Sequence, residues 1–168
     1  SWVLPFDVHR RVVEHDAGQR RAADGLLGLP GGLRAALTRL AEAELNGQAV
    51  AVRSSARSED SAFVSCAGQY ESFLNRRTAS EIIEAVRRCY ASFESENAQT
   101  YLELHGLPLA DEAMAVIVQL MVRPERAGVL FTRHPVDGTP DMVVEYTDGL
   151  GTPVVAGSID PATERLSR

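Results

Sequence analysis

Residues 49–60 read AVAVRSSARSED, in which an apolar first part is followed by a mostly polar and charged second part. Ala49 to Arg53 is a short apolar run of β-prone residues, which predicts a buried strand that ends at an arginine and two serines. The Arg53 guanidinium offers a fork of donors that matches phosphate oxygens, and the small residues after it allow backbone amides to approach the same anion. The stretch therefore predicts a strand that delivers Arg53 to an anion site. The alternative is an ion pair of Arg53 with Glu59 or Asp60 at a helix start.

Two further stretches carry polar groups where regular structure ends. Residues 65–69 (SCAGQ) form a small-residue loop in which Gly68 permits close approach of a ligand and Gln69 offers an amide. Residues 114–122 (MAVIVQLMV) predict a strand buried on both faces, with Gln119 as its only polar side chain. The free end of this strand offers a donor and an acceptor to a purine edge. The alternative for residues 65–69 is an ordinary turn. The alternative for residues 114–122 is a strand that ends before Pro124 and has no binding role.

Helical spacing is clear in two places. Apolar residues recur over 33–41, and Asn46-Gly47 follows as a left-handed stop. Thr78 and Glu81 form a capping-box pattern that starts a second helix, which we expect to continue to Leu104 with a kink. Residues 1–24 are expected to form a docking stretch that runs into a short helix.

The C-terminal part of the chain shows strand patterns. Short strands are expected at 128–132 and 142–146, separated by a Pro-Val-Asp-Gly turn at 135–138. A glycine-spaced segment follows from Gly149 to Gly157. With the helices before them, these strands predict a mixed α+β class.

Composition excludes several chemistries. All 17 basic residues are arginine, so Schiff-base chemistry and a Walker-type phosphate lysine are excluded within this chain. The net charge of -6 argues against nucleic-acid binding, which needs a cationic surface. The arginine pairs are interleaved with acidic residues and are expected on solvated helix faces: Arg10-Arg11, Arg20-Arg21, Arg76-Arg77 and Arg87-Arg88. The longest apolar run, 113–122, is too short to span a membrane.

The cysteines and histidines predict no site of their own. Cys66 and Cys89 lack CxxC spacing, which favours reduced thiols in a soluble, cytoplasmic protein, and Cys89 lies on the apolar stripe of its helix. The four histidines are unclustered, so structural or surface roles are expected for His9, His15, His105 and His134. No metal site is predicted within the chain.

Read in order, these blocks resemble a known family. The order VRSSA-x-x-ED, S-x-AGQ-x-x-x-x-LN, VQ-x-MV, AGV-x-FT-x-x-P, VVE-x-x-x-GLG and VxG is similar to the ATP-binding domain of the pyruvate phosphate dikinase and phosphoenolpyruvate synthase group, which includes rifampicin phosphotransferase. The matching residues are Val52 to Ala56 with Glu59 and Asp60, Ser65 with Ala67 to Gln69 and Leu74-Asn75, Val118-Gln119 with Met121-Val122, Ala127 to Val129 with Phe131-Thr132 and Pro135, Val143 to Glu145, Gly149 to Gly151, and Val155 with Gly157.

The resemblance implies an ATP-grasp-like nucleotide-binding domain that is incomplete at both ends. Residues 1–118 would form the first subdomain, without its phosphate-lysine segment, and 119–168 the hinge and the start of a truncated second subdomain. Arg53 would be the catalytic residue and would hold phosphate oxygens. The implied nucleotide-binding set is Arg53, Ser54, Ser65, Ala67, Gly68, Gln69, Gln119, Met121, Val122 and Arg133, with 65–69 over the phosphates and 119–122 at the adenine.

The resemblance also implies a reaction. Members of this group move the β-phosphoryl of ATP to a histidine on a separate swivelling domain, release the γ-phosphate, and pass the phosphoryl group to an acceptor such as pyruvate or an antibiotic, leaving AMP. Such transfer rests on positioning and charge neutralisation, so arginine, backbone amides and Mg²⁺ suffice here. The implied partners are ATP, the swivelling phosphohistidine domain and an acceptor-binding domain. The ligands for Mg²⁺ are expected outside this chain.

The sequence departs from the family pattern in several places. A GGK segment is expected before Ser1, and acidic metal ligands with a QxRP-type strand are expected after residue 168. Cys66 stands where the family has phenylalanine, and Thr152 stands where it has glutamate. This fragment alone is therefore expected to be inactive. The alternatives are a non-catalytic nucleotide-binding or interaction module and an arginine-rich nucleic-acid binder.

Overall fold

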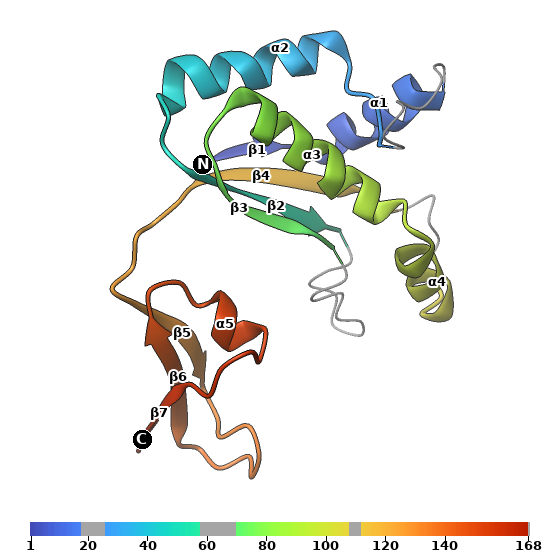
Figure 1. Ribbon diagram of the computed structural model, residues 1–168. Coiled ribbons are helices and arrows are strands. Elements are labelled where there is room, and N and C mark those ends of the chain that lie inside the picture. Colours follow the sequence, from blue (N-terminus) through green and yellow to red (C-terminus); the bar gives the residue numbers. More distant parts are fainter. Residues whose placement is uncertain (18–25, 58–69, 108–111, 168) are drawn as a thin grey trace. The chain divides into compact units, whose positions relative to one another are not determined.

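The computed structural model describes residues 1–17, 26–57, 70–107 and 112–167 of the 168-residue chain. The chain divides into two compact units, Ser1–Met121 and Val122–Arg168. Each unit has its own antiparallel sheet, which can be followed in Figure 1. The mixed α and β content agrees with the class predicted from the sequence patterns.

The first unit is a four-stranded sheet with α1, α2 and α3 on one side (Figure 1). The strands lie in the order β1-β4-β2-β3, and each neighbouring pair is antiparallel. The described elements, in chain order, are β1 (Trp2–Leu4), α1 (Phe6–Ala17), α2 (Gly31–Arg39), the π-helical segment η1 (Leu40–Leu45), β2 (Val50–Ala56), β3 (Ser72–Arg76), α3 (Ala79–Phe93), α4 (Glu96–Leu104) and β4 (Met114–Leu120).

The register of β2 against β4 separates apolar from polar residues. Val52 pairs with Val118 and Arg53 with Ile117. Because side chains alternate between faces, the two valines share one face and Arg53 lies on the other. The valine face is the core: Val52 is fully buried and packs with α3 residues, among them Ile82, Val86, Tyr90 and Phe93.

The helix signals in the sequence are largely confirmed. Thr78 caps α3 with a complete capping box, in which its side chain accepts from the Glu81 amide. Asn46 and Gly47 adopt positive φ angles of 45° and 76° directly after η1, as the predicted left-handed stop requires. Cys89 is fully buried in the core, and burial raises the pKa of its thiol to about 12. The structural interpretation of Cys89 is therefore confirmed.

Three expectations about the strands need correction. β2 does not end at Arg53: Ser54, Ser55 and Ala56 continue the ladder against β4. β4 ends at Leu120 and is not buried on both faces, because Gln119 and Leu120 are exposed. The sheet is antiparallel, and the helices α1–α3 pack on one face only, so the second face of β4 is not covered by them. The expected docking stretch is β1, which pairs with β4 and extends this sheet, and the short helix expected after it is α1.

Two helical expectations also need correction. The segment from Thr78 to Leu104 is not one kinked helix, because Ser95 caps a second helix by accepting from the Ala98 amide. Arg87 does not lie on a solvated face. It is 9% exposed, and its Nε donates to the Leu27 carbonyl at 2.9 Å.

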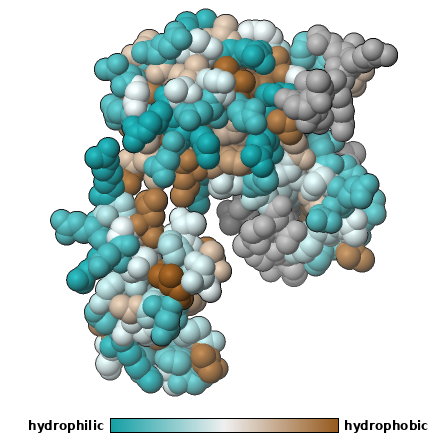
Figure 2. Space-filling model, in the orientation of Figure 1, coloured by the Kyte–Doolittle hydropathy of each residue, from teal (hydrophilic) through white to brown (hydrophobic). Residues whose placement is uncertain are grey.

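The second unit is a three-stranded sheet in the order β5-β6-β7. Its elements are β5 (Arg126–Phe131), β6 (Met142–Asp148), the short helix α5 (Thr152–Val155) and β7 (Ala162–Leu166). The predicted turn before β6 is confirmed, with Gly138 at φ 69°. Neither α5 nor β7 was predicted. Large apolar side chains on this unit are exposed, and Figure 2 shows apolar atoms among its hydrophilic ones.

None of the helices in the described part of the chain combines the length and the hydropathy that a membrane span requires.

Candidate functional site

Arg53 lies in the middle of β2, on the sheet face opposite the core. It pairs with Ile117 of β4 on one side and Ser72 of β3 on the other, and its side chain is exposed. Among the described residues, the guanidinium of Arg53 has no hydrogen-bond or ion-pair partner, so its donors are available to a ligand. The alternative partners Glu59 and Asp60 lie outside the described residues.

Gln119 shares this face of the sheet. It pairs with Ala51, two positions before Arg53, and is exposed. Diagonal neighbours on one face of an antiparallel pair lie about 7–8 Å apart. A guanidinium and a primary amide therefore stand within the span of one nucleotide-sized ligand, although they come from strands that are distant in the sequence.

Two other predicted site residues do not present a free polar group beside Arg53. These are Ser54 and Met121. Ser54 pairs with Val116 and lies on the core face, so adjacency in the sequence does not bring its hydroxyl beside the Arg53 guanidinium. The amide of Met121 donates to the Ala49 carbonyl at 2.9 Å. That donor is therefore used to extend the β2–β4 ladder and is not free for a purine edge.

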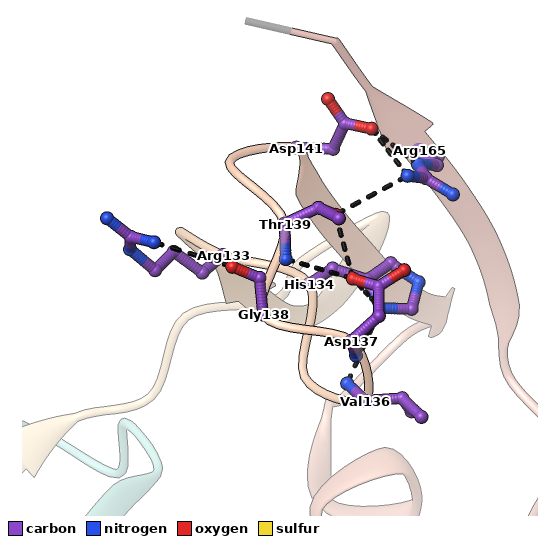
Figure 3. Close-up of polar contacts among 8 residues, drawn as sticks. All are labelled: Arg133, His134, Val136, Asp137, Gly138, Thr139, Asp141 and Arg165. Carbon is purple, nitrogen blue, oxygen red and sulfur yellow. Dashed lines mark hydrogen bonds and ion pairs between the residues drawn. The ribbon is translucent and has the colours of Figure 1, made fainter.

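Val122 and Arg133 belong to the second unit. Val122 is 70% exposed. Arg133 follows β5 in the hairpin loop that leads to β6, and its side chain is exposed. Its Nη1 donates to the Gly138 carbonyl at 3.4 Å, as Figure 3 shows. The remaining guanidinium donors of Arg133 have no partner among the described residues.

The loop that carries Arg133 is held by its own polar groups (Figure 3). His134 and Thr139 are joined through the backbone at 3.1 Å, and the Asp137 carboxylate accepts from the amide and the hydroxyl of Thr139 at 2.9 and 2.8 Å. These two hydrogen bonds lower the pKa of the Asp137 carboxyl, and the bond from the Thr139 amide has the larger effect. Arg133 thus projects from a loop with a defined conformation.

Arg165 fastens the same loop to β7. Its Nε and Nη2 both bond Asp141, at 2.7 and 2.6 Å, and Nη2 also lies 3.4 Å from the Thr139 hydroxyl (Figure 3). Nothing in the sequence pattern pointed to Arg165 or Asp141, because they are far apart in the chain and each occurs alone. Only the antiparallel pairing of β6 with β7 brings them together.

The predicted site residues are thus distributed over the chain. Arg53 and Gln119 share one sheet face of the first unit, and Val122 and Arg133 lie in the second unit. The predicted phosphate-covering residues Ser65, Ala67, Gly68 and Gln69 lie outside the described residues. Within the described ranges, no group of histidine, cysteine or acidic side chains is arranged to hold a metal ion.

An exposed arginine and an exposed amide on one sheet face can bind an anion but do not identify a family. The family described as pyruvate phosphate dikinase, AMP/ATP-binding domain, matches residues 29–168. This chain belongs to that family. The match includes all strands from β2 to β7, and with them Arg53, Gln119 and Arg133, whereas β1 and α1 precede it.

Curated relatives of this AMP/ATP-binding domain carry names of phosphotransferases and synthases. The chain is 45% identical over 68% of its length to a protein named "Probable phosphoenolpyruvate synthase" in Methanothermobacter thermautotrophicus. It is 39% identical over 90% of its length to rifampicin phosphotransferase of a Streptomyces species, and 42% identical over 67% to phosphoenolpyruvate synthase of Aeropyrum pernix. The chain spans 17%, 18% and 14% of these three relatives, respectively, so it corresponds to one part of much longer proteins.

Proposed function

We propose that this chain binds ATP as the nucleotide-binding part of a dikinase-type phosphotransferase. The observation that carries the proposal is the exposed Arg53 guanidinium, which has no partner among the described residues and lies on the same sheet face as Gln119, inside the range that matches an AMP/ATP-binding domain. A guanidinium binds phosphate oxygens through two parallel hydrogen bonds, and an exposed amide can donate to and accept from a base. The names of the relatives support a phosphotransferase.

The fold proposed for this function is ATP-grasp. Residues 1–118 would form the first subdomain, and 119–168 the hinge and the beginning of the second. The division of the chain after Met121 and the separate antiparallel sheets of the two units support this two-part arrangement. Arg53 and Gln119 would contribute from the first part, and Val122 and Arg133 from the second.

Arg53 would act by electrostatic stabilisation. Phosphoryl transfer spreads negative charge over the phosphate oxygens, and a fixed cation beside them lowers the barrier without any covalent step. Arg53 is suited to this role because an antiparallel ladder holds its backbone on both sides. Arg133, on its hydrogen-bonded loop, is proposed as a second cation for the nucleotide. Ser54 and the 65–69 loop remain predictions.

In the proposed overall reaction, ATP, water and an acceptor give AMP, inorganic phosphate and the phosphorylated acceptor. The acceptor oxygen is a hydroxyl or, for pyruvate, the enol oxygen formed when a methyl proton leaves, and its proton is replaced by the phosphoryl group. The β-phosphoryl group is carried by a histidine of another domain, and the γ-phosphate leaves after hydrolysis. Mg²⁺ would neutralise the phosphate charge, but the described residues contain no suitable ligand cluster, so its ligands are sought outside them. The free thiol of Cys89 supports a reducing, cytoplasmic setting.

The proposal is tested by nucleotide analysis of the full-length parent protein. The protein is incubated with ATP and Mg²⁺, with pyruvate or a rifamycin as the acceptor, and the products are separated by chromatography. AMP and inorganic phosphate in equal amounts are expected. Formation of ADP alone would overturn the dikinase assignment. Saturable ATP binding with no turnover for any acceptor would instead favour the non-catalytic nucleotide-binding module.

A further inference from the structure

A cavity of about 430 Å³ opens between α1 and the end of α3. It is lined by one side of α1, including His9 and Glu14, by Phe93 and Glu94, and by Glu112 just before β4. This His9 cavity is on the helix side of the sheet, because the His9 ring stacks on Tyr90 and meets Phe93 of the core edge to face. Arg53 lies on the opposite face, so the cavity is separate from the proposed nucleotide site.

His9 in this cavity is buried and incompletely bonded. It is 4% exposed, and its Nδ1 faces the Met114 amide at 3.4 Å. The amide can only donate, so Nδ1 accepts and Nε2 carries the ring proton. Among the described residues, Nε2 has no hydrogen-bond partner, and a carboxylate oxygen of Glu94 lies 3.8 Å away. The cavity therefore contains a buried donor that lacks an acceptor.

Two more polar atoms near His9 are also unsatisfied. Oε2 of Glu112, which lines the cavity, and the hydroxyl of Tyr90, whose ring stacks on His9 at 5.1 Å, are buried without a partner among the described residues. Buried polar groups in folded proteins are almost always hydrogen-bonded. His9 and Glu112 both line the cavity, so these two atoms, one a donor and one an acceptor, indicate that it holds something with both acceptors and donors.

Charge and shape restrict the class of that occupant. Among the described lining residues, Glu14 and Glu112 are carboxylates and Arg10 is the one arginine; Glu94 also lines the cavity but has an interaction of its own. His9 adds no positive charge at neutral pH, because burial lowers the pKa of its imidazole to about 4. The excess of negative charge favours a cation. Val13 and Phe93 supply an apolar wall, which favours a ligand with an apolar or aromatic body.

We propose that the His9 cavity is a binding site for a small organic cation. The ammonium group of the ligand donates to Glu112, a carbonyl or hydroxyl oxygen accepts from Nε2 of His9, and the apolar body packs on Phe93 and Val13. The site is built in part by α1, which precedes the range that matches the family. Because the cavity and Arg53 lie on opposite faces of the sheet, the proposed nucleotide site does not depend on a ligand in the cavity.

The probe for this proposal is L-phenylalaninamide, which combines an ammonium group, a carbonyl and a phenyl ring. The matched control is N-acetyl-L-phenylalaninamide, which keeps the ring and carbonyls but has no charge. Both are titrated into the full-length protein by calorimetry. We expect the probe to bind saturably and the control to bind about tenfold more weakly or worse, because a hydrogen bond between charged groups is lost.

The variant Glu112→Gln keeps the shape of the side chain and removes its charge. We expect it to weaken probe binding about tenfold, with unchanged ATP affinity and thermal stability. Glu42→Gln, an exposed position on η1, should change neither affinity. The proposal is overturned by a lack of saturable binding, which would mean that water alone fills the cavity, by equal affinity for both probes, or by full affinity of Glu112→Gln. ATP binding is measured in the same preparations. If ATP binds but the probe does not, the proposal for the cavity fails and the proposed nucleotide site stands.

Discussion

Arg53 and Gln119 project from the same face of the four-stranded sheet because Arg53 pairs with Ile117 and Gln119 pairs with Ala51 on the neighbouring antiparallel strand. The residues are far apart in the sequence, and the register alone makes them neighbours. In the proposed function, Arg53 holds phosphate and Gln119 holds the base. The two roles can be separated by experiment.

Gln119→Ala is expected to weaken ATP binding several-fold without affecting the binding of inorganic tripolyphosphate. The side chain is exposed and carries no packing, so the melting temperature should not change. Calorimetric titration of both ligands into wild type and variant checks this. A parallel loss of tripolyphosphate binding would assign Gln119 to the phosphates instead of the base.

Gly128→Ala should strongly destabilise the second unit. A Cβ at this position would lie 1.9 Å from the Glu145 carbonyl oxygen and 2.6 Å from the Tyr146 Cα, and backbone atoms of a paired strand cannot move aside. We expect a loss of about 3 kcal/mol or more in the free energy of unfolding. The readout is hydrogen exchange of the β5 and β6 amides during denaturant titration.

The matched control for Gly128 is Gly32→Ala on α2, where no atom beyond the neighbouring residues and the helix's own backbone lies within 4 Å of the added carbon. Because alanine loses less backbone entropy on folding, this change should be neutral or stabilising by about 0.4–1 kcal/mol. If both substitutions changed the free energy of unfolding equally, the close contact with β6 would not be the reason for a glycine at position 128.

Arg87→Met is expected to destabilise the first unit by about 1–3 kcal/mol, because the carbonyls of Leu27 and Leu26 lose a buried donor. The neighbouring Arg88 is the internal control. Its ion pair with Glu71 is solvent-exposed at 3.5 Å, so Arg88→Met should cost less than about 1 kcal/mol. Urea unfolding monitored by circular dichroism measures both. A larger effect at Arg88 than at Arg87 would contradict the assigned burial.

The stability of the first unit should fall in mild acid because of His9. Burial lowers the pKa of this imidazole from 6.5 to about 4, so between these values the unfolded chain binds a proton that the folded chain does not. The free energy of unfolding should therefore decrease as pH drops from 6.5 to 4, by at most about 3 kcal/mol. Urea unfolding of wild type and His9→Gln across this range tests it. An equal slope in both proteins would assign the effect to other groups.

The sequence predicted the elements whose signals are local. The Thr78 capping box, the Asn46-Gly47 stop and the strands around the Gly138 turn are encoded by residues within a few positions of one another, and the structure contains them. The resemblance to the dikinase family also rested on short blocks with fixed spacing, and the family match confirms it.

Features that depend on register or on distant contacts were not predicted. The polar residues after Arg53 predict that the strand ends there, yet Ser54 to Ala56 are small enough to continue in the ladder. The sequence predicts a surface position for Arg87 because arginine is usually exposed, whereas the Leu26 and Leu27 carbonyls make its burial possible. The Arg165–Asp141 pair and the His9 cavity join segments that no local pattern relates.

The most direct test of the central claim compares ATP and adenosine binding in wild type and Arg53→Ala of the full-length protein by calorimetry, with Arg34→Ala on α2 as an exposed-arginine control. If Arg53 holds phosphate, its removal should weaken ATP binding about tenfold or more, through loss of a charged hydrogen bond, and leave adenosine binding unchanged. Unchanged ATP affinity in Arg53→Ala, or an equal loss for ATP and adenosine, would contradict the account.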